Sequence, residues 1–557
     1  MTTRERCEKR LAGLKAMRGP YETEWREIAS YAQPARSRWL NSDANKNLRQ
    51  RNRLNTSHGI FAFRTLQGGM TSGLSSPSRP WFSQTTFNED LKEEGEVKAW
   101  LAEVERRMYA FLAQTNFYGA VKTGYLELGL FGTEACVMVE HPSEGAVCHQ
   151  LTAGEFWIGI GTSLQADTLY RRAPMTVKQA CERFPKDKLR SEVKRDYDQG
   201  HYERLVNIFH AIEPNDDHDP ERMDAKGKAF RSIYWDEGDH TKAREGDGAV
   251  LEVSGFEEKP FWAPRWDTTS SADSWGSGPG HDALPDLREL QVQSKRKGEA
   301  TDLLIWPEMV APAKLKLRRQ PRSVISAATP DIDKVTVPYE VPYQAVAVIR
   351  DDIEKCEGAV DRAAYADLFM AITNMQGIQP RNIEEIASRN EEKLTQLGPV
   401  IERVNNEKLE VAIDRTFGIM ERAGLLPPAP DIIREEGGQT KTEFVSILTQ
   451  MQRMVGLGQI ERTIGFVGNL AGVVPDVLDK IDYDEVVDEY ASRAGAPPKI
   501  LRSVKDVGKI RQDRANQQSV EQAAAMAGPA KDGAEAARLL AETSQNVMPL
   551  AASPIPL

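Results

Sequence analysis

The sequence contains none of the short motifs that mark the common enzyme classes. Its 557 residues hold no GxxxxGK[ST] loop, no HExxH pair and no GxSxG turn. The first of these cradles nucleotide phosphates, the second ligates zinc, and the third presents a serine nucleophile. The eight histidines are dispersed and have no obvious catalytic partners. We therefore predict a protein that is not an enzyme, with no catalytic residue, no metal site and no cofactor.

Cysteine is scarce, and long apolar runs are absent. The five cysteines form no CxxC pair, so neither a disulfide framework nor a zinc ribbon is predicted, and free, partly buried thiols are expected. They are Cys7, Cys136, Cys148, Cys181 and Cys356. No apolar run approaches the roughly 18 residues that span a bilayer, and the segment MTTRERCEKR lacks the apolar part of a signal peptide. This predicts a protein without a membrane partner that is cytosolic or is assembled in a cytosol.

Two polar segments resemble ligand sites only weakly. Gly276–Gly280 (GSGPG) is glycine-rich, but no apolar strand precedes it, and Pro279 removes one backbone donor. A turn that enters a helix is therefore favoured over a phosphate cradle. Asn215–Asp219 (NDDHD) offers oxygen ligands and one histidine, yet it lies between two prolines. This context favours a solvated loop over a divalent-cation site.

Length and composition predict a soluble globular protein with more than one domain. A chain of 557 residues is too long for one ordinary core, so two to four domains are expected. The hydrophobic fraction of 40% and the charged fraction of 28% are ordinary for a globular protein. The formal net charge is -11.

The N-terminal half combines helices with short strands. Tyr21–Ala32 has apolar residues at helical spacing and is followed by Pro34, and Gly95–Ala113 carries a second apolar stripe. From about Glu134 to Trp262 the pattern changes to β-like runs separated by turn residues. These runs are ACVMVEH, EFWIGIG, DTLYRRA, VNIFHAI, RSIYWD and AVLEVSGF. We predict an α+β body with an antiparallel sheet.

The middle of the chain predicts a long hairpin arm. A helix can run from Pro285 to about Ile305, and its centre, QVQSKRKGEATD, is polar on every face. Residues 306–342 hold six prolines and form an irregular excursion, and a second helix returns from about Gln344 to Thr373. A helix that is polar all round bridges or lines something rather than lying in its own core.

The C-terminal part is predicted to be largely helical. After the segment NMQGIQPR, a helix is expected from Asn382 to about Ala423, interrupted and kinked at Gly398-Pro399. A further helical region is expected from about Lys441 to Asp513. The tail that follows is expected to be weakly packed helix or disorder.

Positive charge is concentrated in the predicted arm although the whole chain is acidic. In KLKLRRQPRS, lysine and arginine alternate with leucine, which predicts a strand with Lys314, Lys316 and Arg318 on one face. Arg319 and Arg322 extend this cluster. Nine basic and four acidic residues between positions 288 and 322 give this segment a local charge of +5.

Three interpretations of the basic segment remain open. It is a solvated edge strand whose lysines discourage aggregation, a docking surface for an acidic partner protein, or a segment close to a phosphate backbone. Aromatic residues are few here, so base stacking on a single strand is not indicated. No helix-turn-helix or finger spacing indicates readout of a base sequence.

Several longer motifs occur in a fixed order along most of the chain. LQGGMTSGLSSPSRPWF (66–82) is a small-residue stretch before an aromatic pair, and GFEEKPFWAPRW (255–266) precedes WGSGPGHDALPDLREL (275–290). Further stretches are residues 25–34, which follow a W-x-x-I-x-x-Y-x-x-P pattern, and residues 115–140, 167–180, 391–428 and 475–503. Together they resemble the portal (head-to-tail connector) proteins of short-tailed, T7-like bacteriophages. Trp275 stands where many of those relatives have tyrosine.

The resemblance implies a ring-forming portal fold and divides the chain into parts. Residues 1–278 would form the wing, 279–305 and 343–373 the two stem helices, 306–342 the clip, 374–381 the tunnel loop, 382–428 a kinked wing helix, 429–514 the crown, and 515–557 a C-terminal helical barrel or flexible tail. The polar helix that follows Pro285 fits a stem that packs against copies of itself around a water-filled channel.

The resemblance also implies a function. A ring, usually of twelve subunits, would stand at one capsid vertex and pass double-stranded DNA, without sequence specificity, during packaging and ejection. Implied partners are other copies of the chain, the major capsid protein and scaffold, the terminase large subunit, and tail adaptor proteins. The protein would belong to the virion and pass through the host cytoplasm during assembly. The alternative is a cytosolic scaffold or adaptor that binds an acidic partner through the basic arm.

Candidate site residues lie in the stem, the clip and the tunnel loop. The candidates for proximity to the channel and DNA are Lys295, Arg296, Lys297, Lys314, Lys316 and Arg318. The candidates for partner docking at the clip are Arg318, Arg319 and Arg322. The tunnel-loop residues are Asn374, Met375, Gln376, Gly377, Ile378, Gln379, Pro380 and Arg381. Which basic residues face the channel is left open.

Overall fold

The computed structural model describes most of the chain. The described residues are 2–34, 54–88, 94–219, 221–222, 224, 227–237, 250–270, 272–307, 342–373, 391–435, 440–446, 448–449, 457–471, 479–494 and 507–517. The chain divides into two compact units, Met1–Thr463 and Ile464–Leu557, and each is described by itself.

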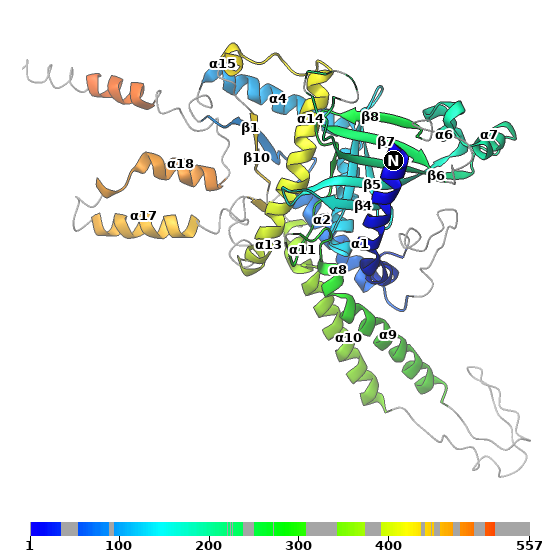
Figure 1. The fold of residues 1–557 in the computed structure, drawn as a ribbon. Coiled ribbons are helices and arrows are strands. Elements are labelled where there is room, and N and C mark those ends of the chain that lie inside the picture. Colours follow the sequence, from blue (N-terminus) through cyan, green and yellow to red (C-terminus); the bar gives the residue numbers. More distant parts are fainter. Residues whose placement is uncertain are drawn as a thin grey trace, which may run out of the picture. The chain divides into compact units, whose positions relative to one another are not determined.

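The first unit contains a five-stranded antiparallel sheet with the order β4-β5-β6-β7-β8 (Figure 1). Its strands are β4 (Phe156–Ile160), β5 (Ala166–Thr176), β6 (Leu205–Pro214), β7 (Phe230–Asp236) and β8 (Glu252–Phe256). Each strand pairs with its sequence neighbour, so the sheet is a meander. The sequence prediction of an antiparallel sheet in this region, within a body of mixed helix and sheet, is confirmed.

Two smaller sheets complete the β structure of the described residues. β2 (Ala135–His141) pairs with β3 (Gly145–Leu151) and with β9 (Phe261–Trp262), and β1 (Phe82–Thr86) pairs with β10 (Thr440–Phe444). β10 contradicts part of the prediction that Lys441 to Asp513 is helical. Its sequence TKTEF alternates threonine with charged residues, and β-branched threonine favours strands. The partner strand lies more than 350 residues earlier in the chain, which local periodicity cannot reveal.

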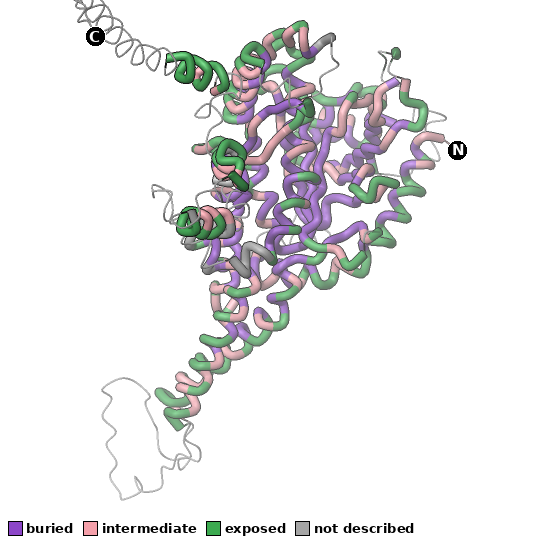
Figure 2. The backbone as a smooth tube through the Cα atoms, turned by 90° about the vertical axis from the view of Figure 1, so that its left-hand side faces the viewer, coloured by how far each residue is buried: buried purple, intermediate pink, exposed green. Residues whose placement is uncertain are grey.

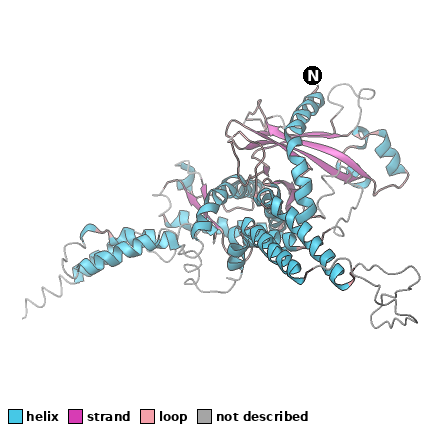
Figure 3. Ribbon diagram, turned by 90° about the horizontal axis from the view of Figure 1, so that it is seen from below, coloured by secondary structure: helices cyan, strands magenta, loops and turns pink. Residues whose placement is uncertain are grey.

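Helix α1 (Thr3–Ala32) packs along one face of the five-stranded sheet (Figures 1 and 3). It begins much earlier than predicted, because Thr2 accepts a hydrogen bond from the Glu5 N–H and Glu5 accepts one in return, which forms a capping box. The helix ends at Ala32, before Pro34, as predicted.

The other face of the same sheet is covered in part by a small helical lobe. The lobe consists of α6 (Val177–Arg183), the 3-10 turn η3 (Lys186–Lys188) and α7 (Ser191–Asp198). Its buried side chains, such as Val177 and Phe184, pack against Ile208 of β6 and Tyr234 of β7. The sheet is therefore buried on both faces at this end.

The main core lies between the helices α2 (His58–Leu74), α4 (Gly95–Gln114) and α5 (Phe117–Phe131) and the sheet β3-β2-β9. The predicted helix over Gly95–Ala113 is confirmed by α4. Large aromatic side chains, including Trp25, Trp81 and Trp262, are almost fully buried here. Burial of such rings is the largest apolar contribution to a core of this kind.

The small residues of the motif LQGGMTSGL let α2 approach its neighbours closely. A methyl group on Gly69 would lie 2.2 Å from Cβ of Phe369, whereas a methyl group on Gly68 would meet nothing within 4 Å. Gly69→Ala should therefore lower the free energy of unfolding by about 1–3 kcal/mol, because a side chain fixed by its backbone has to move. Gly68→Ala is the matched control and should be neutral or slightly stabilising. Equal chemical denaturation curves for the two variants would refute this packing.

The predicted hairpin arm is present as two helices that lie side by side and project away from the sheets (Figure 1). The turn α8 (Pro279–Asp282) leads into α9 (Leu284–Ile305), so GSGPG enters a helix as predicted. α10 (Tyr343–Ala363) returns. The predicted helix to Thr373 is broken at Tyr365, which has a left-handed φ of 52°, and α11 (Ala366–Thr373) follows. Tyr365 packs against Trp266 and Phe369, and these contacts outweigh helix continuation.

A long helical element follows in the first unit and crosses the core. It consists of α13 (Glu391–Val404), the π-helical turn η6 (Asn405–Leu409) and α14 (Glu410–Arg422). The prediction of an interruption at Gly398-Pro399 is wrong, because α13 runs through Pro399. Its apolar side chains, Leu397, Val400, Ile401 and Val404, are buried and hold the helix where Pro399 removes one hydrogen bond. The change in helical geometry comes at η6 instead.

Short elements complete the described chain. α15 (Asp431–Glu435) follows α14, α17 (Leu457–Ala471) crosses the boundary between the units, and α18 (Tyr483–Ala494) lies in the second unit. Residues 507–517 are helical, and Arg511 pairs there with Asp484. The helical character predicted for about Lys441 to Asp513 is confirmed in α17, α18 and residues 507–513, whereas α15 lies outside the predicted helices. Most of the predicted clip, the tunnel loop and the tail after residue 517 lie outside the described residues.

Candidate functional site at the helical hairpin

The base of the α9–α10 hairpin is buried in the core. Leu287 and Leu290 of α9 are fully buried, as is Val360 of α10. Leu290 packs with Ile353 and Cys356 across the two helices. The residues at this end are spaced three or four apart, which places them on one side of each helix. The hairpin is therefore rooted in the body by ordinary apolar packing.

Polar contacts fix the base of the hairpin to α2 and to the two residues, Asn55 and Thr56, that precede it closely in the chain. The side chain of Gln291 accepts a hydrogen bond from the Asn55 N–H at 2.8 Å and donates one to the Thr56 carbonyl at 3.1 Å. His58, at the start of α2, lies 2.9 Å from the Asp361 carboxylate of α10. Gln291 is buried, and His58 and Asp361 are half-buried, so these hydrogen bonds help to set the direction in which the hairpin leaves the body.

The outer half of the hairpin is exposed, and much of what it exposes is apolar. Figure 2 shows the change from buried residues at the base to exposed residues toward the tip. Large apolar side chains there have exposed fractions between 37% and 80%. They are Leu303, Leu304, Ile305, Trp306, Tyr343 and Val348. We call these six residues the outer apolar patch. Large exposed apolar side chains that gather at one end of an arm indicate an interaction site.

The three basic stem candidates lie on α9, and all are exposed. Lys295, Arg296 and Lys297 are consecutive, so successive side chains point about 100° apart around the helix. They cannot share one environment. Lys295 lies 3.6 Å from Glu299 on the same helix, an exposed pair that contributes little to stability. α9 as a whole has four basic and four acidic residues, so its charge is balanced.

The remaining basic candidates and the tunnel-loop candidates lie outside the described residues. These are Lys314, Lys316, Arg318, Arg319 and Arg322, and residues 374–381. The helices that flank these two segments are described. α9 ends at Ile305 and α10 begins at Tyr343, while α11 ends at Thr373 and α13 begins at Glu391.

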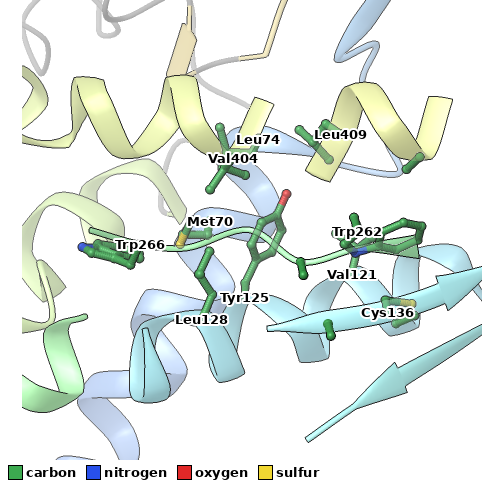
Figure 4. Close-up of a cluster of buried hydrophobic side chains, with 14 of the residues drawn as sticks. Met70, Leu74, Val121, Tyr125, Leu128, Cys136, Trp262, Trp266, Val404 and Leu409 are labelled. Carbon is green, nitrogen blue, oxygen red and sulfur yellow. The ribbon is translucent and has the colours of Figure 1, made fainter. Parts of the chain in front are cut away.

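Sequence reasoning missed a set of buried ion pairs between the long α13–α14 element and the sheets. Lys408, in the π-helical turn, lies 2.5 Å from the Glu134 carboxylate, and both side chains are fully buried. The Lys408 ammonium also lies 3.7 Å from the ring centre of Tyr125. Figure 4 shows Tyr125 reaching from α5 toward the helices that carry Val404 and Leu409. Burial raises the pKa of Glu134 and lowers the pKa of Lys408, and the charge of each partner counteracts the other's shift.

Two further clusters extend this line of ion pairs. Arg265 of the GFEEKPFWAPRW motif pairs with Glu407 at 2.8 Å, and both side chains are almost fully buried. Arg415 is 1% exposed and lies 2.5 Å from Glu258 of the same motif, which also binds Arg422. Arg422 and Arg415 hold the pKa of Glu258 below its ordinary value although burial acts in the opposite direction. This motif thus holds the long helical element against the body.

The cysteines and the NDDHD segment have ordinary structural surroundings in the described residues. All five cysteines are free and buried. Asp216 and Asp217 of the NDDHD segment are largely exposed and lie near Arg231. In the described part of the chain no three His, Cys, Asp or Glu side chains lie close enough to hold a metal ion. No described helix is both long and apolar enough to cross a membrane.

Comparison with known proteins gives consistent matches over nearly the whole chain. Residues 4–501 match the family model described as "Bacteriophage head to tail connecting protein". The chain is 35% identical over 543 residues to the "Portal protein" of Salmonella phage epsilon15, covering 96% of this chain and 95% of that protein. It is also 35% identical over 554 residues to the "Probable portal protein" of Bordetella phage BPP-1, covering 98% and 97% of the two chains.

Proposed function

Because the chain belongs to the bacteriophage head-to-tail connecting protein family and is a portal protein of the capsid vertex, we propose that copies of it pack their α9–α10 hairpins side by side in a ring. The centre of this ring would pass double-stranded DNA into and out of the capsid. The protein has no enzymatic role. The resemblance of its motifs to portal proteins implies twelve copies.

The outer apolar patch is the observation that carries this proposal. A single chain leaves Ile305 63% exposed and Tyr343 80% exposed, and both belong to an arm that is rooted in the core at its other end. A neighbouring copy of the hairpin would cover such side chains at little cost, because rings of identical subunits repeat one interface around an axis. The polar remainder of α9 can then face water inside the ring.

The charge of the chain suits a conduit for DNA. Each copy contributes a formal charge of -11, so the ring would be acidic as a whole. A uniformly basic wall would bind phosphates through release of counterions and would hinder sliding. Since Lys295, Arg296 and Lys297 point in different directions, we propose that only part of this trio faces the DNA. The rest would face a neighbouring subunit.

The parts of the chain are proposed to serve different partners. Residues 1–278 would form the wing against the capsid, and residues 279–305 and 343–373 the stem. The clip, residues 306–342, would dock first the terminase motor and later the tail adaptor proteins, with Lys314, Lys316, Arg318, Arg319 and Arg322 as its basic surface. Residues 382–428 would be the long wing helix, 429–514 the crown, and 515–557 a barrel or tail.

A charge placed in the outer apolar patch should block ring formation. Val348 of α10 is 59% exposed, so Val348→Asp should leave the folded subunit intact but bury a carboxylate between neighbouring hairpins. We expect a shift from ring to monomer in size-exclusion chromatography with light scattering. Val253→Asp on β8, where Val253 is 46% exposed, is the matched control and should still form rings. Rings that form equally well with Val348→Asp would refute this interface.

The proposed tunnel loop is tested by a short deletion. Residues 374–381 lie between the ends of α11 and α13, and Gly377 and Pro380 suit an irregular constriction close to the DNA. Deleting Gly377 to Gln379 should allow rings to form but reduce the packaged or retained length of DNA. Normal DNA length in particles that carry this deletion would contradict the assignment.

A further inference from the structure

A row of polar side chains crosses the five-stranded sheet on the face opposite α1. Arg171 of β5 pairs in register with His210 of β6, His210 with Tyr234 of β7, and Tyr234 with Glu252 of β8. Tyr170, the residue before Arg171, packs with side chains of α1. Because successive residues of a strand point to opposite faces of the sheet, the row lies on the face opposite α1.

The row lies between two apolar clusters. On one side are the side chains under the α6–α7 lobe, including Ile208. On the other side are Leu169 and Ile212, which belong to the main core. We call the row Arg171, His210, Tyr234 and Glu252 the polar furrow. A polar strip that separates two apolar clusters needs a partner for each of its charges.

His210 orients Arg171 without neutralising it. Nε–H of Arg171 donates to Nδ1 of His210 at 3.0 Å, and Nε2 of His210 lies 2.9 Å from the Ser232 hydroxyl. The His210 ring stacks on Tyr234 at 3.8 Å. The pKa of His210 lies well below its ordinary value, mainly because the ring is buried and also because of the charge of Arg171. This imidazole is therefore neutral. The two terminal nitrogens of Arg171 stay available.

The charge on Arg171 has no carboxylate partner. The residue is only 5% exposed, yet no acidic oxygen lies within 4 Å of its guanidinium among the described residues. Other buried arginines differ: Arg4 pairs with Asp236, and Arg265 with Glu407. At the far end of the furrow Glu252 is already bound by Arg183 at 2.8 Å.

The surroundings of Arg171 are electropositive. The pKa of His149 on β3 is lowered to about 4, mainly by burial and to a smaller extent by the charge of Arg171. The terminal nitrogens of Arg171 are not fully enclosed without a partner, as some other buried polar atoms are. We infer that a small anion can reach this cation.

From these contacts we propose that the polar furrow is an oxyanion-binding site, in which the two terminal nitrogens of Arg171 hold a single carboxylate or inorganic oxyanion. A guanidinium binds such groups through two parallel hydrogen bonds. Because Arg171 is only 5% exposed, we expect it to bind one oxyanion group and not a polymer backbone. The anion would come from solution or from an acidic side chain of a protein docked on this part of the wing.

The test is binding of sulfate and of acetate by the assembled protein, measured by thermal unfolding and by calorimetry against chloride at equal ionic strength. We expect a saturable stabilisation by one or both anions, with the unfolding temperature raised by about 2 °C or more. Sulfate also stabilises proteins generally by exclusion from their surface. The comparison between variants removes that general effect.

Arg171→Met should abolish the saturable part of the response. Arg172→Met is the matched control, because Arg172 is the next residue on the same strand and points toward Lys15 and Arg18 on the opposite face. It should bind the anions as the parent does. If Arg171→Met does not fold, Arg171→Lys keeps the charge but loses the forked geometry, and binding should weaken at least tenfold.

The two sources of the anion give different results. Tighter binding of sulfate than of acetate supports a free inorganic oxyanion, and equal or tighter binding of acetate supports a carboxylate from a docked protein. Both must depend on Arg171. An anion response that is unchanged in Arg171→Met, or in Arg171→Lys where the first variant cannot be used, would overturn the proposal. So would the absence of any saturable response in the parent protein.

Discussion

Replacing Lys408 by methionine should lower the free energy of unfolding by about 3–5 kcal/mol, because it leaves the Glu134 carboxylate buried without its counter-charge. Both side chains are fully buried, and the apolar surroundings include the ring of Tyr125. A glycine at position 124 allows this arrangement, since a methyl group there would lie 1.8 Å from the Glu134 carboxylate. Chemical denaturation of the unassembled subunit measures the change.

The double variant Lys408→Met with Glu134→Gln should recover most of the lost stability, because a buried pair replaced on both sides leaves no lone charge. Lys122→Met on α5 is the control, since Lys122 is exposed, and its effect should be close to zero. A Lys408→Met protein as stable as the Lys122→Met protein would show that the pair does not hold η6 against the sheet.

Replacing Gly132 by alanine should cost about 3 kcal/mol or more, and for two separate reasons. Gly132 ends α5 with a left-handed φ of 68°, which a side chain adopts at a cost of about 1–2 kcal/mol. In addition, the new methyl group would lie 2.2 Å from the Gly276 carbonyl oxygen. That oxygen belongs to the backbone and cannot turn away, so the turn before α8 has to move. The base of the hairpin begins at this turn.

Gly200→Ala separates the two causes. Gly200 also has a left-handed φ, 78°, but nothing lies within 4 Å of the position of a new methyl group. It should show the conformational cost alone, about 1–2 kcal/mol. We expect Gly132→Ala to be the more damaging substitution and to reduce ring assembly as well. Equal losses of stability in the two variants would mean that the approach of Gly276 to Gly132 does not constrain the fold.

The sequence predicts elements well where one local pattern decides them. α4 has clear helical spacing, the hairpin helix α9 begins close to Pro285 and ends at Ile305 as predicted, and the meander follows from alternating runs bounded by turns. Predictions failed where distant contacts decide the structure. β10 is a strand because β1 is available to pair with it, and Tyr365 breaks a helix because it packs on Trp266. The sequence predicts an interruption at Pro399, but apolar packing keeps α13 continuous.

The buried charges could not be predicted from one sequence. Glu134 and Lys408 are separated by more than 270 residues, and nothing in the local pattern around either marks it as buried. Arg265 and Glu407 are separated by 142 residues. The one local signal is the motif GFEEKPFWAPRW, which is dense in aromatic and charged residues. Its Glu258 and Arg265 form ion pairs with the α13–α14 element. A π-helical turn likewise has no simple sequence signature, and it becomes visible only with its contacts.

The most direct test of the account is electron microscopy of the purified protein in solution, with the mass of the particles measured in parallel. The account predicts closed rings with a central channel, in which the α9–α10 hairpins of neighbouring subunits lie side by side and cover the outer apolar patch. A single species of monomer at high protein concentration would contradict it. That result would favour the alternative of a scaffold or adaptor that binds an acidic partner through its basic arm.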